Sequence, residues 1–390
     1  MRASNAPLLF GAVVGSEPTT DGLPLLPPLK FLPQVSFNLS QRVWAVVRQF
    51  GVVSPLEGRV SLLKKSAGIM KVGVFTVILG SMNLEQTLDY VAQLGAKAVE
   101  LGAGAYAGAA HCDVDALLAS KRKIKVLLQM VHSRGLQISA LNCAGNPIHP
   151  NRKLAAADDS AFRKALRLAG NLGVEVVINF SGCPGGAPGD KQPNWVTCPW
   201  PAYYLEILKY QWETVAVPYW CKAAEFAHKH GINKIALEMH PGFLVYNPET
   251  LLKLRKAAGP SIGANFDPSH LFWQGIEPCS AVRALQGAIW HVHAKDLAIH
   301  EWNSRRNGVL DTKHYSDEAN RAWIFRTVGY GNSRHFWCNF LSALRMAGYD
   351  GALSMEHEDS LMTAKEGLEK GMSFLRSIIL DEPKGQVTWA

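Results

Sequence analysis

Four short segments of the chain each end an apolar run with a side chain that can bind a metal ion. The segments read IALEMH, GANFDPSH, HVHAKD and LSMEHED, and the side chains in question are Glu238, Asp267, His293 and Glu356. Carboxylate oxygens with one imidazole suit Mn²⁺, Mg²⁺ or Co²⁺, and such a set leaves positions open for substrate oxygens. The four residues therefore predict an open divalent-metal site that handles a polyhydroxylated, sugar-like substrate.

The elements that must position these side chains repeat along the chain from Met70 onward. Apolar runs rich in Val, Ile, Ala and Leu predict strands near 71–77, 97–102, 136–142, 174–180, 234–239, 262–267, 289–294 and 351–356. Helical spacing of apolar residues predicts helices over 83–94, 114–134, 158–172, 202–230, 248–258, 277–286, 334–347 and 363–379. Eight such units in series predict a parallel sheet covered by helices and favour a closed (β/α)8 TIM barrel of the α/β class.

Glycines mark several of the expected helix ends. A glycine that ends a helix precedes four of the predicted strands: Gly95, Gly135, Gly173 and Gly231.

Two connections are long, namely 181–201 and 297–333, and both leave the carboxyl ends of strands, where barrel active sites lie. Their aromatic residues predict ordered loops that cover the substrate: Trp195, Trp200, Trp302, Trp323 and Tyr330.

The domain organisation follows from a change in composition at Met70. Residues 1–69 are rich in Pro, Leu and Ser and lack a sustained period, so we expect an N-terminal extension that is disordered or not native, with Met70 as a natural start. Residues 70–382 form the barrel domain and 383–390 a tail. About half of the formal net charge of +8 lies before Met70. The barrel domain is thus only mildly basic, and we expect no nucleic-acid partner.

Composition places the chain among globular proteins. It has 390 residues, of which 48% are hydrophobic and 18% charged, and no apolar stretch long enough to span a bilayer. Its seven cysteines lack paired spacing, which predicts free thiols in a reducing compartment such as the cytoplasm. No GxGxxG follows the first predicted strand, which disfavours a dinucleotide-binding site.

Further polar residues flank the four candidate ligands or end other strands. His240 and His270 follow Glu238 and Asp267 closely and are expected to orient ligands or contact substrate. His291 shares a strand face with His293 and is either an outer partner of the metal site or a core histidine. The remaining candidates are Asn142 for a substrate hydroxyl, His149 as a base and Arg326 for a hydroxyl or carboxylate.

The motifs ALEMHP, NFDPSHLFWQG, HVHAKD and SMEHED together resemble the sugar phosphate isomerase/epimerase family, which has a xylose isomerase-like TIM barrel. The resemblance covers about residues 70–380, and ALNCAGNPIHP and FRTVGYG look closest to the metal-bearing subunit of C-glycoside deglycosidases. It implies that Glu238, Asp267, His293 and Glu356 are the metal ligands and that His270 contacts substrate. It also implies that the two glutamates flank the reacting carbon, as in ketose 3-epimerases.

We therefore predict a divalent-metal-dependent sugar isomerase or epimerase that abstracts a proton beside a carbonyl and passes through an enediolate. Mn²⁺ is the expected metal, with Mg²⁺, Co²⁺ and Zn²⁺ as alternatives. The best-studied epimerases carry an arginine where this chain has Ile299 and His300, so β-elimination from a 3-oxo-glycoside is the second candidate. That reaction could involve a small partner subunit, and a homo-oligomer is also expected.

Two further classes compete with these reactions. An abasic-site zinc nuclease uses the same barrel but needs histidines at the ends of strands two and three. Those ends read VELGAG and LNCAG here, without histidine. A non-catalytic subunit that binds sugar or protein is disfavoured because all four ligand candidates are present.

Overall fold

A computed structural model describes residues 69–389 of the chain. The boundary expected at Met70 therefore falls at the start of the described residues, and the N-terminal extension lies outside them. Within residues 69–389, no helix combines the length and the apolar character needed to cross a membrane. The seven cysteines all lie in this part of the chain and none forms a disulfide.

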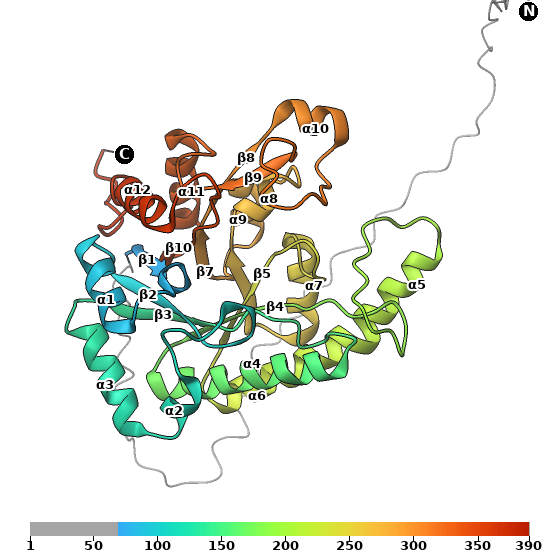
Figure 1. Cartoon of the computed structure of the whole chain (residues 1–390), viewed down its shortest axis with the longest axis horizontal. Helices are drawn as coiled ribbons and strands as arrows, with labels where there is room; N and C mark the ends of the chain where they lie inside the picture. Colours follow the sequence, from blue (N-terminus) through green and yellow to red (C-terminus); the bar gives the residue numbers. More distant parts are fainter. Residues whose placement is uncertain (1–68, 390) are drawn as a thin grey trace, which may run out of the picture. The chain divides into compact units, whose positions relative to one another are not determined.

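Eight parallel strands close into a barrel, which confirms the predicted TIM barrel (Figure 1). Around the barrel the strands follow the order β1-β10-β7-β6-β5-β4-β3-β2. The strand bounds are β1 Lys71–Phe75, β2 Ala98–Gly102, β3 Gln137–Asn142, β4 Val176–Phe180, β5 Lys234–Glu238, β6 Ile262–Phe266, β7 Ile289–Ala294 and β10 Ala352–Met355. Every residue of β2 and β6 is buried, because one face meets the lumen and the other the helices.

Helices surround the barrel at the predicted places. They are α1 Leu84–Gln93, α2 Val114–Leu118, α3 Lys121–His132, α4 Arg152–Leu172, α5 Tyr203–Lys209, the π-helix η3 Tyr210–Ala216, α6 Val217–Lys229, α7 Pro248–Ala258, α9 Pro278–Ala284, α11 Arg334–Met346 and α12 Ala364–Arg376. The four glycines expected to end helices have φ between 69° and 84° (Gly95, Gly135, Gly173 and Gly231). Their left-handed backbone confirms the predicted stops.

Two predicted helices differ in detail from the observed ones. The segment 114–134 is broken at Ser120, whose side chain accepts a hydrogen bond from the N–H of Lys123 and so caps a new helix. The helix expected from 158 begins at Arg152, because Asn151 caps the N–H of Lys153. Polar capping residues therefore set these boundaries more than the apolar period does.

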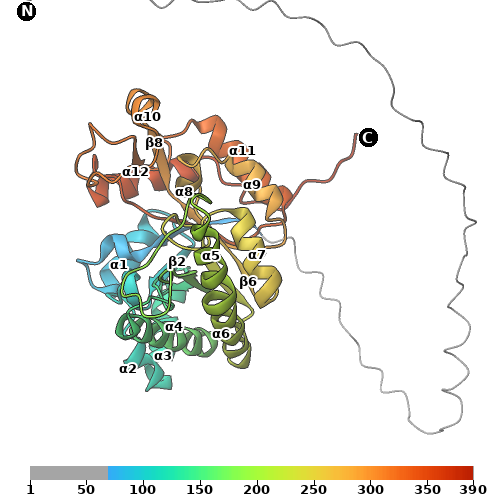
Figure 2. The ribbon, with the colours of Figure 1, turned by 90° about the vertical axis from the view of Figure 1, so that its right-hand side faces the viewer.

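The connection 297–333, predicted as a long loop, contains secondary structure of its own. β8 (Asp296–Ile299) pairs antiparallel with β9 (Trp323–Arg326), and α10 (Glu301–Asn307) lies between them in sequence. Leu297 of β8 and Trp323 and Phe325 of β9 are buried and pack with Trp273 in one apolar cluster. Figures 1 and 2 show β8 and α10 together on one side of the barrel, near the short α8 (Ser269–Phe272). The connection is therefore a folded cap.

Candidate metal centre

The four candidate ligands come from the carboxyl ends of four barrel strands. Glu238 ends β5, Asp267 follows β6, His293 lies in β7 and Glu356 follows β10. Strand register helps to align them, since Glu238 pairs with Asn265 of β6 and His293 with Ser354 of β10. One ligand atom from each of the four residues lies within 4.8 Å of the others. The structure therefore brings together the four side chains that the sequence analysis proposed as ligands.

The cluster is shielded from solvent on most sides. Nδ1 of His293 lies 3.3 Å from Oε2 of Glu238 and 3.0 Å from Oε2 of Glu356. Among the four side chains, Glu356 is the most exposed, at 15%. The opening toward solvent is thus beside Glu356, which leaves a ligand room to approach from that side.

The donor set fits a divalent cation. Three carboxylates and one imidazole form a hard, oxygen-rich set, and bonds of about 2.1–2.5 Å would join atoms at these separations to one ion. Oδ1 of Asp267 accepts the N–H of Ser269 at 2.8 Å, while its buried Oδ2 accepts no hydrogen bond. The buried Oε2 of Glu356 accepts none either. Both oxygens face a positive charge instead, because Nζ of Lys295 lies 3.1 Å from Oδ2 of Asp267 and 2.9 Å from Oε2 of Glu356. A divalent cation would compete with this ammonium group for the two oxygens, and Glu238 and His293 would complete the set of ligands.

Glu100 of β2 supports the histidine from below, and the sequence analysis missed it. Nε2 of His293 lies 3.1 Å from both carboxylate oxygens of Glu100. A nitrogen that donates to a carboxylate leaves the other nitrogen, Nδ1, facing the three ligand carboxylates. Burial raises the pKa of Glu100, but His293 and His291 outweigh it and lower that pKa. The available signal was its position in the segment VELG, near the end of the predicted second strand.

Glu238, Glu356 and His293 hold shifted pKa values because they face one another in the absence of bulk water. Burial raises the pKa of Glu356, yet Lys295 and His293 lower it to about 2. Burial likewise raises the pKa of Glu238, which His270 and His293 bring well below its ordinary value. For His293, burial lowers the pKa, and Glu100 and Glu356 raise it well above the ordinary value. The glutamates are therefore ionised and available as ligands, whereas His293 is protonated and would release a proton when it binds a metal ion.

Lys295 is a second group that the sequence analysis did not assign. Its Nζ lies 3.1 Å from Oδ2 of Asp267 and 2.9 Å from both Oε2 of Glu356 and Oε2 of Glu358. The ammonium group also lies 4.7 Å from the ring centre of Phe325. Residues 291, 293 and 295 alternate onto one strand face, and that period was the available signal. Lys295 supplies positive charge inside the carboxylate cluster.

His270 and His240 lie beside the cluster as predicted. Nε2 of His270 lies 3.0 Å from Oε1 of Glu238 and 3.2 Å from Oδ2 of Asp267. The rings of His240 and His270 are 4.1 Å apart. Burial first and His270 second lower the pKa of His240 to about 3, so this imidazole is neutral. His270 thus orients two of the ligands, and both rings face a neighbouring cavity.

The other predicted contacts have protein partners. Nδ2 of Asn142 donates to Oε1 of Glu100 at 2.8 Å, so Asn142 supports the glutamate below the histidine. Nδ1 of His149 accepts the N–H of Asn151 at 2.9 Å, next to the start of α4. Nε of Arg326 donates to Oδ2 of Asp359 at 3.1 Å. The structure does not include these three residues in the four-ligand cluster, and their substrate roles stay predictions.

His291 lies deeper in the barrel than His293. Its Nδ1 is 3.0 Å from Oδ1 of Asn265, and its Nε2 is 3.3 Å from Oγ of Ser139. Burial, as the main cause, lowers the pKa of His291 to about 4. His291 is therefore a neutral, hydrogen-bonded histidine in the barrel interior. Its Nε2 also lies 3.7 Å from Oε2 of Glu100, and the two residues form with His293 a second group that could hold a metal ion.

A cavity of about 350 Å³ adjoins the cluster and is lined by both long connections. Trp195 and Thr197 come from 181–201, Tyr315 and Trp323 from 297–333, and His240 and His270 face it from the barrel side. Of the five aromatic residues predicted to cover a substrate, Trp195 and Trp323 line this cavity. Trp200, Trp302 and Tyr330 do not line it and are 78%, 78% and 45% exposed.

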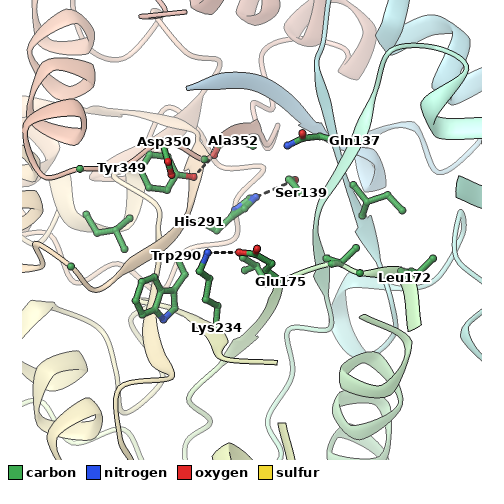
Figure 3. Close-up of a pocket in the computed structure, with 18 of the residues that line it drawn as sticks. Gln137, Ser139, Leu172, Glu175, Lys234, Trp290, His291, Tyr349, Asp350 and Ala352 are labelled. Carbon is green, nitrogen blue, oxygen red and sulfur yellow. Dashed lines mark hydrogen bonds and ion pairs between the residues drawn. The ribbon is translucent and has the colours of Figure 1, made fainter. Parts of the chain in front are cut away.

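A larger cavity of about 580 Å³ lies at the opposite end of the barrel, where the strands begin (Figure 3). Figure 3 shows Ser139 hydrogen-bonded to His291 on one side and Lys234 paired with Glu175 on another. The active sites of TIM-barrel enzymes lie at the other end, where the strands finish. The four-ligand cluster and its adjoining cavity are therefore the candidate site.

Residues 88–378 match the family described as xylose isomerase-like TIM barrel. The chain is 44% identical over 312 residues to the uncharacterized protein YfiH of Bacillus subtilis (strain 168), which covers 80% of this chain and 99% of that protein.

Several solved structures share the barrel. A D-tagatose 3-epimerase-like protein has a TM-score of 0.53 and 24% identity, with 79% of this chain and 98% of that chain covered. The probable 3-DHS dehydratase AsbF from Bacillus anthracis has a TM-score of 0.54 and 16% identity, covering 79% and 99%. A xylose isomerase domain protein from Planctomyces limnophilus has a TM-score of 0.53 and 16% identity, covering 80% and 97%. At these identities the likeness shows the fold, and the match over residues 88–378 shows that the chain belongs to the xylose isomerase-like TIM barrel family.

Proposed function

We propose that the protein is a divalent-metal-dependent sugar isomerase or epimerase that moves a proton at a carbon beside a carbonyl. The observation that carries this proposal is the four-ligand cluster, whose donor atoms lie within 4.8 Å of one another at the carboxyl ends of the strands. An isolated carboxylate at a strand end is common, whereas four donors that converge from four strands support a metal site. Mn²⁺ is the cation we propose, and Mg²⁺, Co²⁺ and Zn²⁺ are the comparisons.

The chain's own residues supply the proton transfer. Glu238 and Glu356 approach Nδ1 of His293 from different strands, β5 and β10, so they border the cluster on two sides. We propose that one glutamate takes the proton from the substrate carbon and the other returns a proton to it. When bound, a divalent cation would polarise the substrate oxygens and favour the enediolate. His270 and Lys295 hold the glutamates and Asp267 in place.

The fold relatives support a polyhydroxylated substrate. One is named as D-tagatose 3-epimerase-like and another as a probable 3-DHS dehydratase. Both names describe compounds that carry several hydroxyl groups. We extend that substrate class, but no individual compound, to this chain.

Proton exchange with solvent tests the proposal directly. The Mn²⁺-loaded full chain is incubated in D₂O with ketoses, inososes and 3-oxo-glycosides, and deuterium at carbon is measured by NMR. We expect metal-dependent incorporation at a carbon beside the carbonyl of at least one probe. If the loaded protein exchanges no probe faster than the metal-free protein, the proposal is wrong.

Two glutamates provide the variant and its control. Glu356→Gln should lower the exchange rate at least about 100-fold, because it removes a general base. Glu366→Gln is the matched control, because Glu366 lies on α12, is 48% exposed and pairs with Lys370 away from the four-ligand cluster. Calorimetric titration with Mn²⁺ separates loss of metal from loss of the base. Equal rates for Glu356→Gln and the wild type would remove Glu356 from the mechanism.

β-Elimination from a 3-oxo-glycoside is the second candidate function. The aromatic cavity beside the cluster favours it, because a free ketose would leave that space unused. The position of the epimerase arginine is also taken by Ile299, which is 42% exposed. Release of the free aglycone from a 3-oxo-glycoside, followed by chromatography, would identify elimination. Epimer formation without release would identify epimerisation.

A further inference from the structure

A surface groove lies between three of the helices that surround the barrel. It has a volume of about 660 Å³ and is lined by residues of α1, of α2 and the segment before it, and of α3. Figure 1 shows α3 on the outside of the barrel, with α1 and α2 beside it. None of the lining residues belongs to the four-ligand cluster or to the cavity next to that cluster. The proposed chemistry therefore does not use this groove.

Most of the side chains that line the groove are apolar. Leu117 and Leu127 are buried, Leu84 and Met130 are half-buried, and Val126 is 47% exposed. Val126 and Met130 lie one turn apart on α3 and so share a face of that helix. An apolar groove of this kind accepts the apolar face of an amphipathic helix, whose side chains recur at i, i+3, i+4 and i+7.

The α3 helix beside this lining is strongly basic. Its sequence, KRKIKVLLQMVH, contains four Lys or Arg residues and no acidic one. The four are exposed, and none pairs with a carboxylate of residues 69–389: Lys121, Arg122, Lys123 and Lys125. The acidic residues of α1 and α2 have other partners, since Glu85 and Asp89 pair with Arg134, and Asp115 pairs with Lys164. The groove therefore has four cations available to an external ligand.

The position of these cations on the helix is unfavourable in the free protein. The N–H of Lys123 donates to Oγ of Ser120 at 3.3 Å, so Lys121, Arg122 and Lys123 form the first turn of α3. A helix N-terminus carries partial positive charge, which favours acidic residues in that turn and disfavours basic ones. A partner that brings several negative charges offsets this repulsion.

We propose that the groove docks an acidic amphipathic helix of a partner protein. The apolar face of that helix packs on Val126, Met130 and their neighbours, and its carboxylates pair with the cations of α3. Charge complementarity decides the occupant. Four separate cations match several acidic residues along a helix, whereas a small carboxylate ligand meets only one or two of them.

Designed peptides test this proposal with the full chain. Three peptides of about 18 residues carry leucines at i, i+3, i+4 and i+7 in different registers, with glutamates on both flanks. Binding is measured by fluorescence anisotropy beside versions in which lysine replaces every glutamate. At least one acidic peptide should bind at least about tenfold more tightly than its lysine version, and about 0.5 M salt should weaken it at least about fivefold relative to 0.05 M. If no acidic peptide is preferred, the proposal is wrong.

Two variants separate the charge from the apolar lining. Lys123→Glu should weaken peptide binding about tenfold, and Val126→Asn about fivefold. Lys222→Glu is the matched control, because Lys222 is an exposed lysine of α6 that does not line the groove. If this control weakens binding as much as Lys123→Glu does, the peptide does not dock in the groove.

The Lys123→Glu variant also has an expected effect of opposite sign on the free protein. A glutamate three residues after the capping Ser120 completes a capping box and suits the helix dipole, so the variant should raise Tm by about 1 °C. Weaker peptide binding by a more stable protein cannot result from unfolding. Unchanged peptide affinity in Lys123→Glu would overturn the role of the α3 cations.

An anionic membrane is the competing partner for a basic, partly apolar surface. Sedimentation with vesicles of phosphatidylcholine and phosphatidylglycerol in equal parts measures this alternative. Vesicle binding that Lys123→Glu abolishes, together with no preference for any acidic peptide, would replace the protein partner by a membrane. Absence of vesicle binding together with peptide binding supports the proposal.

Discussion

His293 is held at both of its ring nitrogens. Nε2 faces the two oxygens of Glu100, and Nδ1 faces the carboxylates of Glu238 and Glu356. Outer carboxylates of this kind fix which nitrogen of a histidine faces a metal and how the ring is turned. Glu100 itself is held by Nδ2 of Asn142. The geometry of the proposed site therefore depends on residues of β2 and β3 that would not touch the metal.

The first prediction concerns Glu100. Glu100→Gln should weaken Mn²⁺ binding about 10- to 100-fold, because the neutral amide orients the imidazole less strongly than a carboxylate does. Calorimetric titration measures the affinity, and circular dichroism verifies the fold. Glu85→Gln on the surface of α1 is the control, with a glutamate that is 69% exposed. Wild-type affinity in Glu100→Gln would show that Glu100 does not position the histidine.

The sequence identified the four clustered side chains but not the groups that hold them. Glu238, Asp267, His293 and Glu356 could be found because each ends a recognisable strand. Glu100 could not, because its partner His293 lies 193 residues further along the chain. Lys295 was not predicted to belong to the site, because an ammonium group does not bind metal ions. Asn142 and Arg326 were predicted to meet substrate, whereas their observed partners are protein carboxylates, Glu100 and Asp359.

At the scale of elements, two buried aspartates attach the cap to the barrel. Oδ2 of Asp296 accepts the N–H groups of Gly329, Gly331 and Asn332 and the indole N–H of Trp337 at 3.0 Å. Asp359 accepts the N–H of Thr327 at 2.8 Å and of Leu361 at 2.9 Å, besides Arg326. The Asp296 bonds join β8 to the segment after β9 and to α11. The Asp359 bonds join the end of β9 to the segment after β10, which carries Glu356.

The second prediction concerns the pH dependence of this attachment. Burial raises the pKa of Asp359, but the N–H groups of Thr327 and Leu361 and the Arg326 guanidinium lower it overall. A folded-state pKa below the unfolded value, about 3.9, means that the ionised group stabilises the fold above that pH. The contribution is lost as pH falls through the lower folded pKa.

Asp359→Asn should therefore lower the free energy of unfolding by about 2 kcal/mol at pH 7. The difference from the wild type should shrink as pH falls from about 5 to 3. Urea unfolding followed by tryptophan fluorescence measures both quantities. Asp381→Asn, at an exposed position near the end of the described chain, is the control. A difference that stays constant with pH would show that the charge of Asp359 is not responsible.

The elements of the barrel could be predicted much better than those of the cap. Each barrel strand is a local apolar run buried on both faces, so the strand can be recognised without knowing its partner. β8 and β9 are four residues each and are separated by more than twenty residues of chain. Their pairing depends on contacts between distant segments, such as Trp273 with Trp323, which no local period reveals.

At the scale of the whole molecule, metal binding should stabilise the described barrel. The third prediction is that Mn²⁺ at about 100 times its Kd adds about 2.7 kcal/mol to the free energy of unfolding. For a chain of this size that corresponds to a rise in Tm of about 5 °C. Scanning calorimetry with and without Mn²⁺ measures the shift, and excess EDTA should reverse it.

The same measurement on Asp267→Asn provides the comparison, since Oδ2 of Asp267 is one of the four donor atoms. This variant should show a much smaller Mn²⁺-dependent shift than the wild type. A shift of the same size would locate the bound metal elsewhere in the protein.

The position of the His293 ring has a mechanical consequence for the barrel. The ring lies close to the carboxylates of Glu100 in β2, Glu238 in β5 and Glu356 just after β10. On the shorter way round the barrel, β3 and β4 lie between β2 and β5. The His293 ring therefore connects these strands across the lumen. The distance between the strands at this end of the barrel depends on the lengths of the side chains that contact the ring. Shortening Glu100 or Glu238 by one methylene should thus alter the cross-section of the mouth as well as the chemistry within it.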